Sequence, residues 1–465
     1  MIGVNVKLSS IVACLLFAVV LTCAGCIKKD SGQAARRGNG VAGTATLLAT
    51  IAAGEKPPSI PVPSGPGGHA PLEASFQPVF STQGRGVAYS AESNGQVYVV
   101  HNGIARKPYA TTGSIAISSD GTRLAYGALS DGTWRMVIDG VEGEPFSTVK
   151  APIFSPDGVH VAYQAMSGDK WHLVVDATRN AGTDTRILDS AFSGDSAKVA
   201  YIDNASEKNQ GRLVVSDLKF TKQTVVADKV TRFVVNGEGT KLACVSAGPD
   251  GKFSIVEAAF DRPDAVTRRG AYDRVLHISF GPENGPLVYI AEQSGKRLVV
   301  YDGRQEPLPD GGEILEPPVL RPDLKGCGVL ISANGMAYLH ETPAGVGRKQ
   351  KQYEEVAHLA VSRDGKSFAY AASRGGSWFV VVNEAEGPMF DRVVTPKFSP
   401  DGKYLVYRAR QAGRRFVVVA DKTGKTIKTH PAYEQVFDVQ FTADGKSVAY
   451  GVKDGNRLIW QVEKL

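Results

Sequence analysis

Cysteine is scarce in this chain, and so are the other side chains that usually mark covalent or metal chemistry. Five of its 465 residues are cysteine, eight are histidine and four are tryptophan. Cys14, Cys23 and Cys26 lie near the N-terminus, which leaves Cys244 and Cys327 for the body of the chain. These two fall at different places in the sequence pattern, with no Cys-x-x-Cys pair between them. The body is therefore expected to carry free thiols and no disulfide.

The linear motifs of common catalytic sites are missing as well. There is no Gly-x-Ser-x-Gly elbow, no phosphate-binding Gly-x-x-x-x-Gly-Lys and no His-Glu-x-x-His. The histidines are scattered, and only His160 and His172 fall where they could meet across one sheet; for such a lone pair we favour a structural role. No catalytic, cofactor-binding or metal-binding residue is therefore predicted. The net charge of +6 comes from dispersed Lys and Arg, which argues against a nucleic-acid partner.

What the sequence does have is a ten-residue phrase that recurs ten times. Its clearest copy is Phe398–Tyr407, which reads F-S-P-D-G-K-Y-L-V-Y. The copies are spaced by about 40 residues, the period of a propeller blade built from four short strands. The copies open at Phe80, Ile117, Phe154, Phe192, Val235, Phe280, Leu320, Val361, Phe398 and Phe441. They close at Tyr89, Tyr126, Tyr163, Tyr201, Cys244, Tyr289, Val329, Tyr370, Tyr407 and Tyr450.

Each part of the phrase predicts a local structure. The opener ends a strand and is expected in the core, as at Phe154. Ser-Pro-Asp-Gly then reverses the chain, because Pro presets φ, Asp bonds its own backbone and Gly adopts a left-handed conformation. This turn chemistry explains the aspartates without calcium. The small residue before the closing aromatic indicates a face that the next sheet approaches closely. A valine-rich third strand follows, which begins at Trp in three copies, Trp134, Trp171 and Trp378, and packing is the role expected for these rings.

The phrase resembles the repeat of TolB-like and WD40-like (PD40-type) β-propellers over roughly residues 73–465. The resemblance implies an all-β fold, a propeller of about ten four-stranded units. We favour one large ring, because no Pro/Gly-rich linker interrupts residues 80–465. Two smaller tandem rings are the alternative. Their boundary is expected either at the wide spacings on both sides of Cys244 or at the eroded seventh copy, Leu320–Val329.

Residues 1–25 have the features of a signal peptide. Lys7 precedes an apolar stretch, Leu8–Leu21, that is shorter than a transmembrane helix. Ala24-Gly25-Cys26 resembles the lipobox of bacterial lipoproteins, although Cys23 stands where leucine is usual. The resemblance implies lipid attachment at Cys26, and Ile27 after it implies an outer-membrane protein that faces the periplasm. The alternatives are a cell-surface location, or an ordinary cleaved signal peptide and secretion to the periplasm.

The N-terminal region also bears on how the ring closes. Residues 26–71 are rich in Gly, Ala and Pro and are interpreted as a tether, with the propeller at 72–465. The tenth copy ends at Leu465 without a fourth strand, which would leave an open edge. An N-terminal segment is therefore predicted to supply that strand. Leu72–Gln77 is the nearest candidate, and Thr44–Ile51 is the other.

We favour a non-catalytic scaffold for the function: a lipid-anchored propeller with a monomeric globular body that binds one or more envelope proteins and needs no cofactor. Propellers serve many roles, so the fold does not decide between functions. One alternative is a binder of a small ligand or glycan in the central cavity. Another is an enzyme whose site assembles from loops around the ring axis.

Overall fold

The recurring phrase folds into two antiparallel strands joined by a tight turn. In the ninth copy the Oγ of Ser399 donates a hydrogen bond to Oδ1 of Asp401 at 2.6 Å. The same carboxylate oxygen accepts the backbone N–H of Lys403 at 3.1 Å, and Gly402 has a φ of 69°. The predicted turn chemistry is confirmed, because the same side-chain pair recurs in other copies. These pairs are Ser118–Asp120, Ser155–Asp157, Ser193–Asp195, Ser362–Asp364 and Thr442–Asp444.

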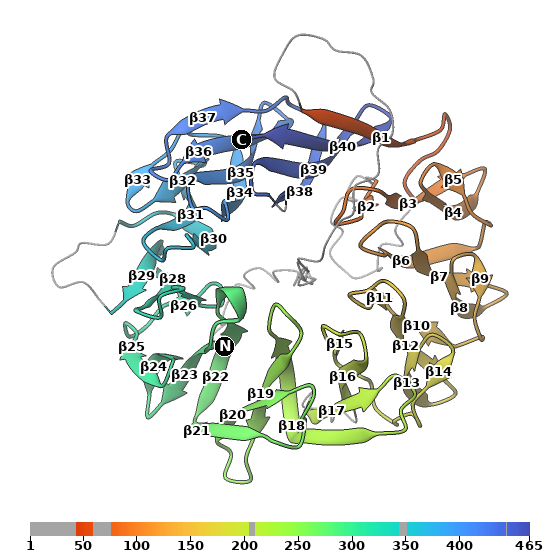
Figure 1. Ribbon diagram of the computed structural model, residues 1–465, viewed down its shortest axis with the longest axis horizontal. Helices are drawn as coiled ribbons and strands as arrows, with labels where there is room; N and C mark the ends of the chain where they lie inside the picture. The colour runs from red at the N-terminus through yellow and green to blue at the C-terminus, as the bar shows by residue number, and fades with distance from the viewer. Residues whose placement is uncertain (1–42, 59–75, 204–209, 344–350, 443) are drawn as a thin grey trace, which may run out of the picture.

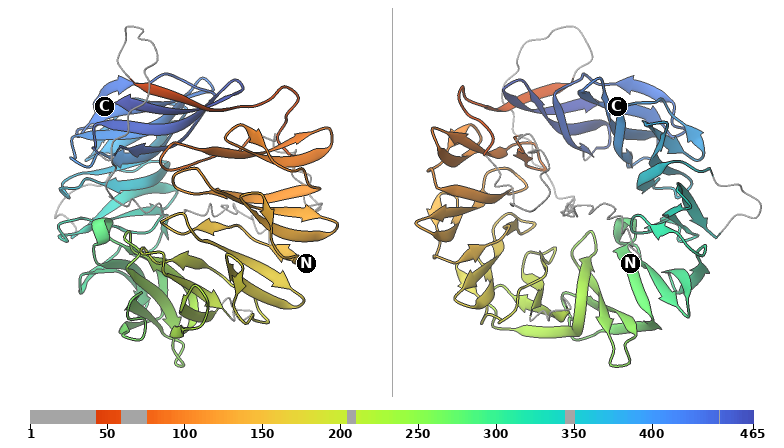
Figure 2. Two further views of the ribbon diagram at one scale, coloured as in Figure 1. Left: turned by 45° about the vertical axis from the view of Figure 1, so that its right-hand side comes forward. Right: turned by 180° about the vertical axis from the view of Figure 1, so that it is seen from behind.

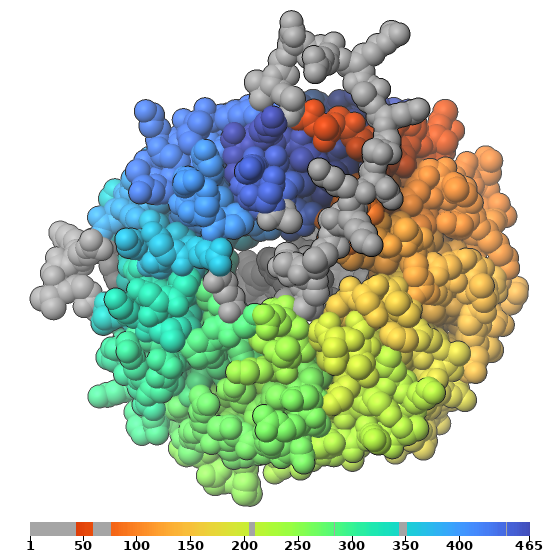
Figure 3. Space-filling model, viewed as in Figure 1, coloured from red at the N-terminus to blue at the C-terminus, as the bar shows by residue number. Residues whose placement is uncertain are grey.

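The computed structural model describes residues 43–58, 76–203, 210–343, 351–442 and 444–465. Within them the strands form nine sheets, and a seven-stranded sheet contains two of the ten units. The sheets stand around one axis as a single closed ring that is hollowed at its centre (Figures 1 to 3). The predicted all-β propeller with one ring is confirmed, and the alternative of two tandem rings is wrong.

The units are named here as blades one to ten in chain order. Blade one consists of β2 (Val79–Phe80), β3 (Val87–Ser93), β4 (Gln96–His101) and β5 (Ile104–Ala105). Blade two consists of β6 (Thr111–Ile117), β7 (Leu124–Ser130), β8 (Thr133–Ile138) and β9 (Val141–Glu142). Blade three consists of β10 (Thr148–Val149), β11 (Ile153–Phe154), β12 (Val161–Ser167), β13 (Lys170–Val175) and β14 (Thr178–Arg179). Blade four consists of β15 (Ser190–Phe192), β16 (Lys198–Asp203), β17 (Gly211–Asp217) and the first part of β18 (Gln223–Val235). Blade five consists of the last part of β18 with β19 (Lys241–Ala247), β20 (Phe253–Ala259) and β21 (Thr267–Tyr272). Blade six consists of β22 (Arg274–Phe280), the short 3-10 helix η1 (Pro282–Asn284), β23 (Leu287–Gln293), β24 (Lys296–Tyr301) and β25 (Arg304–Pro307).

The remaining blades follow the same plan. Blade seven consists of β26 (Glu313–Ile314), β27 (Val319–Leu320), β28 (Cys327–Ala333) and β29 (Met336–Thr342). Blade eight consists of β30 (Glu355–Val361), β31 (Phe368–Arg374), β32 (Ser377–Val382) and β33 (Ala385–Glu386). Blade nine consists of β34 (Arg392–Phe398), β35 (Tyr404–Gln411), β36 (Arg414–Asp421) and β37 (Thr426–Thr429). Blade ten is β38 (Gln435–Phe441), β39 (Ser447–Asp454), β40 (Arg457–Lys464) and the N-terminal β1 (Thr44–Thr50).

The wide spacing around Cys244 does not mark a boundary between rings. The strand β18 is 13 residues long and runs from the outside of blade four directly into the inner edge of blade five. Its first part pairs with β17 and its last part with β19, so one sheet continues through both blades. The eroded seventh copy is not a boundary either. A Cβ at Gly328 would lie 2.9 Å from side-chain atoms of Leu359 and Phe368 in the next blade, so this close approach requires glycine.

The ring is closed by β1, which pairs antiparallel with β40 from Thr44↔Val462 to Thr50↔Arg457 (Figure 1). The second of the two candidate segments is thus the one that supplies the missing strand. The predicted boundary of the propeller at residue 72 is corrected, because Thr44–Thr50 belongs to blade ten. Burial of Ala49 and Ile51 between blade ten and blade one favours this strand. Of the other candidate, Leu72–Ser75 lies outside the described residues, and Phe76 and Gln77 are not in a strand.

The hydrophobic core is divided among the interfaces between neighbouring blades. Since successive side chains of a strand point to opposite faces, the small residue and the closing aromatic of each copy face different neighbours. Ala125 packs with Tyr163 of the following blade, and Ala162 packs with Tyr201 of the next. Edge-on aromatic contacts such as Phe146–Tyr163, with centroids 6.3 Å apart, strengthen these interfaces. The predicted close-packed face is confirmed.

Most of the openers are less buried than predicted, although Phe192 and Leu320 are buried. Phe154 is only half-buried, whereas Tyr126, Tyr201 and Tyr450 are almost completely buried. The reason is that the opener ends the innermost strand of its blade, which borders the central opening (Figure 1). The closing aromatic lies on the second strand, which has a neighbouring strand on each side and a neighbouring blade on each face.

Candidate functional site

The innermost strands are irregular at one recurring place. Bulges interrupt the register of β6, β18, β22, β30, β34 and β38, and in blades three and seven the inner strand is split into two short pieces. Bulges re-aim side chains and are frequent beside functional sites. We name the third residue before each opener the wall position. It is occupied by Gln77, Ser114, Ala151, Asp189, Arg232, His277, Pro317, His358, Thr395 and Asp438.

The wall position differs from the rest of the repeat in its chemistry. The turn residues and the closing aromatic recur in most copies, whereas the wall position carries acids, bases, hydroxyls and an amide, and is apolar at Ala151 and Pro317. Ser114, Asp189 and Asp438 are exposed, and they border the central opening from blades two, four and ten. Protein around Asp189 limits the hydration of its carboxylate and raises its pKa. The inner wall therefore presents a side chain of different chemistry from most blades.

Charged side chains at the wall position and beside it bind the neighbouring blade. Arg232 donates from Nη2 to the carbonyl oxygen of Val275 at 3.1 Å. Arg408 donates from Nη1 to the carbonyl oxygen of Val436 at 3.3 Å. Burial lowers the pKa of both guanidinium groups. The Nζ of Lys397 lies 3.1 Å from Oδ1 of Asp438. Such bonds link adjacent blades to each other near the opening.

His358 is held in an unusual conformation by an acid from the preceding blade. Its φ of 61° is uncommon for a residue other than glycine. The carboxylate of Glu316 accepts the backbone N–H groups of His358 and Leu359, at 2.7 and 3.2 Å. Burial lowers the pKa of the imidazole, and this outweighs the opposite effect of Glu316.

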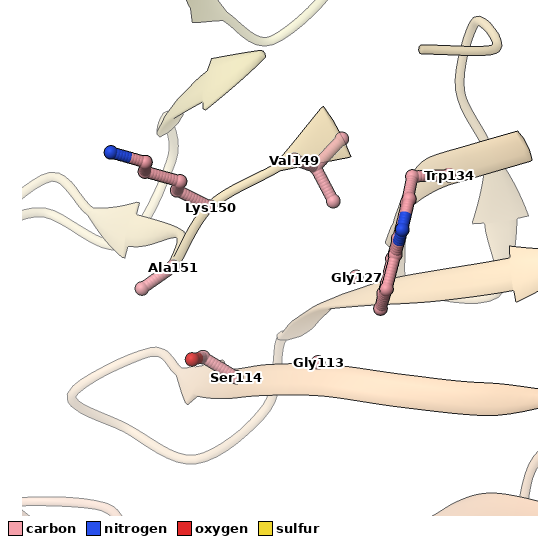
Figure 4. Close-up of a pocket in the computed structure, with 7 residues that line it drawn as sticks. All are labelled: Gly113, Ser114, Gly127, Trp134, Val149, Lys150 and Ala151. Carbon is pink, nitrogen blue, oxygen red and sulfur yellow. The ribbon is translucent and has the colours of Figure 1, made fainter. Parts of the chain in front are cut away.

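A cleft of about 360 Å³ lies between blades two and three. It is lined by Gly113, Ser114, Gly127, Trp134, Val149, Lys150 and Ala151 (Figure 4). The indole of Trp134 turns one face toward Val149, and Ser114, Lys150 and Ala151 border the opposite side of the cleft (Figure 4). The cleft therefore combines an apolar ring with a hydroxyl group, whereas the side chain of Lys150 runs away from Trp134 and its ammonium lies over the Trp171 ring.

A second cavity, of about 470 Å³, lies among the turns of blades eight to ten. Its acids have structural roles. Asp401 and Asp444 accept hydrogen bonds within their own turns, and Asp401 also pairs with Lys403 at 3.2 Å. Its polar groups are therefore largely occupied by the fold itself.

The two histidines that might have met across a sheet do not. His160 lies at the turn side of blade three, where its Nδ1 is 2.7 Å from Oδ2 of Asp176. His172 is buried, and its Nδ1–H donates to the carbonyl oxygen of Asn180 at 3.0 Å. The lipid-attachment residue predicted at Cys26 lies outside the described residues.

Cys244 and Cys327 are free, as predicted, and both are buried. Burial raises the pKa of the Cys244 thiol to about 12 and that of Cys327 to about 11. Within the described ranges no group of three His, Cys, Asp or Glu side chains is arranged to hold a metal ion. In the same ranges no helix is long and apolar enough to cross a bilayer.

Comparison with known proteins shows likeness in structure only. No protein-family model matches the chain, and no curated protein matches its sequence. Solved structures similar to it include a eukaryotic initiation factor, with 11% identity over 75% of this chain and 96% of that chain and a TM-score of 0.45. Others are the Dos1 propeller (11%, 76% and 91%, TM-score 0.38) and the dihydro-heme d1 dehydrogenase NirN (13%, 70% and 74%, TM-score 0.37). The likeness concerns the fold alone.

Sequence reasoning missed both the wall position and the cleft. A signal for the cleft was present, because Gly113 and Gly127 stand where the next unit has Lys150 and Gln164. Only alignment of the copies beyond the ten-residue phrase brings this difference out. The bulges carry no comparable signal, since no single residue type occupies them.

Proposed function

We propose that this protein is a lipoprotein of the bacterial cell envelope whose TolB-like, PD40-type propeller binds a protein partner without catalysing a reaction. The observation that carries the proposal is the wall position. The turn residues and closing aromatics recur in most copies, whereas the wall position varies from blade to blade and is polar in eight of the ten. A polar surface distributed over many blades suits contact with an extended partner.

The ring closure supports an arrangement close to the membrane. If Cys26 carries the lipid, only residues 27–43 separate it from the start of β1 in blade ten. Seventeen residues span at most about 60 Å even when fully extended. Blade ten would therefore be the blade held nearest to the bilayer, which we propose is the outer membrane on its periplasmic side.

The anchor is tested by membrane fractionation. Cys26→Ala should move the protein from the membrane fraction to the soluble fraction, while Cys23→Ala, the matched control, should leave it in the membrane. Metabolic labelling with an alkyne fatty acid should mark the wild type and Cys23→Ala only. Retention of the unlabelled Cys26→Ala protein in the membrane would refute the anchor.

The scaffold is tested with photo-crosslinking residues placed at exposed wall positions. Substitutions at Ser114, Asp189 and Asp438 should each trap the same envelope protein in cells. A crosslinker at Thr178, which is exposed on the outermost strand of blade three, is the control and should not. The proposal fails if the wall positions trap nothing specific, or if the outer position traps the same partner equally well.

A further inference from the structure

Positive charge is concentrated in blade nine. Residues 391–430, which hold this blade, contain ten Lys and Arg and three Asp, so their net charge is +7. The whole chain has a net charge of +6, so all its other residues together are close to neutral. The expectation that Lys and Arg are dispersed is therefore wrong for this blade. Five of the ten cations are arginines near the turn between β35 and β36: Arg392, Arg408, Arg410, Arg414 and Arg415.

Three of these arginines are paired in register across the sheet. Arg392 of β34 lies opposite Arg410 of β35, and Arg410 lies opposite Arg415 of β36. The row therefore runs outward from the central opening over three strands (Figure 1). Like charges that lie directly opposite each other destabilise a sheet. A local cost of this kind is typical of functional sites.

Other blades place an acid in the middle of the same row. In blade six the three positions hold Arg274, Glu292 and Arg297. Both arginines pair with the carboxylate of Glu292, at 3.5 and 3.1 Å. Blade one has Glu92 at the middle position, and Lys56 pairs with it at 3.1 Å. Blade nine keeps the flanking cations and has an arginine in place of the acid.

The guanidinium of Arg410 has no bonding partner in the part of the chain that the structure describes. Arg410 is exposed, and the two flanking arginines contact other blades. The guanidinium carbon of Arg392 lies 3.6 Å from the ring centroid of Trp378 in blade eight. The Nη1 of Arg415 donates to the carbonyl oxygen of Glu434 in blade ten. Arg410 is therefore left to bind an anion from outside the chain.

The acids near this end of blade nine have other partners. Asp391 accepts a backbone N–H of the turn between β35 and β36 at 2.8 Å. The carboxylate of Glu434 pairs with Lys453, and Asp454 pairs with Arg414 at 3.3 Å. These carboxylates therefore do not neutralise the row.

The three arginines keep an excess of positive charge. Burial lowers the pKa of Arg392, Glu355 of blade eight partly offsets this, and the charge of Arg410 lowers the pKa further. Among the described residues no carboxylate lies within ion-pair distance of Arg392, Arg410 or Arg415. An anionic partner is therefore favoured at this end of the blade.

We propose that the envelope protein bound by this propeller contacts blade nine through an acidic segment, whose carboxylates bind Arg410 and the arginines on either side of it. A guanidinium can form two parallel hydrogen bonds with one carboxylate, and Glu292 of blade six shows that a carboxylate fits this row. Neighbouring strands are about 4.8 Å apart, so the row spans about 10 Å and offers room for more than one carboxylate. The inference rests on the proposed scaffold function and specifies its partner.

The first test uses the full-length protein in a non-ionic detergent and isothermal titration with three probes. These are hexaglutamate, neutral hexaglutamine and tripolyphosphate. We expect hexaglutamate to bind at least tenfold more tightly than either of the others. Equal binding of hexaglutamine would refute the role of charge, and tighter binding of tripolyphosphate would assign the row to phosphate groups instead. The absence of binding by hexaglutamate would overturn the proposal.

Variants of the middle arginine locate the site. Arg410→Glu copies blade six, so it should lower the affinity for hexaglutamate at least tenfold and raise the thermal midpoint of unfolding. Arg410→Gln removes the charge alone and should also weaken binding. Lys170→Glu, the matched control, makes the same change of charge at an exposed position of the hairpin in blade three and should leave the affinity unchanged. Unchanged affinity in Arg410→Gln, or an equal loss in Lys170→Glu, would overturn the assignment.

A crosslinking experiment in cells separates this inference from the proposed function. With a photo-crosslinking residue at Ser114, Arg410→Glu should reduce the yield of trapped partner at least fivefold, and Lys170→Glu should not. An unchanged yield in Arg410→Glu would overturn the inference and leave the scaffold function standing. If the residue at Ser114 traps nothing in the otherwise wild-type protein, the scaffold function itself fails.

Discussion

Thr46 of β1 pairs in register with Trp460 of β40, so residues from opposite ends of the chain complete one sheet. This pairing gives blade ten its fourth strand and packs the N-terminal segment against blade one, which closes the row of ten blades into a ring. It also places the residues that follow the proposed lipid anchor directly on the body of the protein. The N-terminal strand therefore has a structural role that its composition alone does not suggest.

Removal of residues 1–51 should open the ring, whereas removal of residues 1–42 should not. The longer deletion exposes the edge of β40 and removes the buried Ala49 and Ile51, a loss on the order of 3 kcal/mol. Thermal unfolding followed by circular dichroism should show a lower midpoint for the longer deletion only, with self-association on size-exclusion chromatography. Equal midpoints for the two deletions would contradict closure by β1.

Tyr450 should tolerate loss of its hydroxyl but not of its ring. The residue is fully buried between blades nine and ten, and its Oη has no hydrogen-bond partner among the described residues. Tyr450→Phe should be neutral or slightly stabilising, because it removes an unsatisfied polar group. Tyr450→Ala should cost about 3–5 kcal/mol. Denaturant unfolding measures both, and a large loss in Tyr450→Phe would show a hidden partner.

His430 should make the protein less stable in mild acid. Burial, with Lys428 nearby, lowers the pKa of its imidazole to about 4 from an ordinary value of 6.5. The unfolded chain therefore binds a proton in this interval that the folded chain does not. Stability is fully present above pH 6.5 and is lost as the pH falls toward 4, by up to about 3 kcal/mol. His430→Leu should flatten the unfolding free energy over that interval.

Glu463 has to be controlled in this experiment. Its Oε2 lies 3.6 Å from Nδ1 of His430, and burial raises its pKa above the ordinary value of 4.5. A carboxyl with a raised pKa favours the folded state as the pH falls, which opposes the effect of His430. The comparison is therefore repeated in a Glu463→Gln background. If adding His430→Leu to the Glu463→Gln protein leaves its pH profile of unfolding free energy unchanged, the assignment to His430 is contradicted.

The repeated turns predict a modest, local cost for loss of an aspartate. Asp401 accepts hydrogen bonds from Ser399 and from the backbone of Lys403, and these lower its pKa. Asp401→Ala should cost about 1 kcal/mol, in the range of a single net hydrogen bond. Asp184→Ala, which removes an exposed acid from a loop, should cost much less by the same chemical denaturation assay. Similar losses in the two variants would show that the turn bonds contribute little.

The two body thiols should be unreactive until the protein unfolds. Burial keeps Cys244 and Cys327 protonated and inaccessible. In a chain that starts at residue 43, a disulfide reagent such as DTNB should modify neither thiol in native buffer and both in guanidinium. Rapid modification of either thiol in native buffer would contradict its buried position.

Prediction from the sequence succeeded where the interactions are local. The Ser-Pro-Asp-Gly turn is built from residues within five positions of each other, so its hydrogen bonds follow directly from residue type, as at Ser399 and Asp401. The alternation of Ala125 and Tyr126 between two faces follows from the period of a strand. Prediction failed where a residue's surroundings come from another blade. Phe154 has a large apolar side chain of the kind expected in a core, but its strand borders the opening, so the side chain is only half-buried.

By itself, then, the sequence determined the repeat, the strand and turn positions and the all-β ring, because each depends on short-range geometry repeated ten times. The tertiary structure decided which N-terminal segment closes the ring, because β1 and β40 meet only when all ten blades are in place. It also decided that Trp134 borders a cleft, whereas a cationic side chain lies over the ring of Trp171 and over that of Trp378. That difference depends on side chains brought together from the inner and third strands and from neighbouring blades, and pairings of this kind are set by packing across the ring.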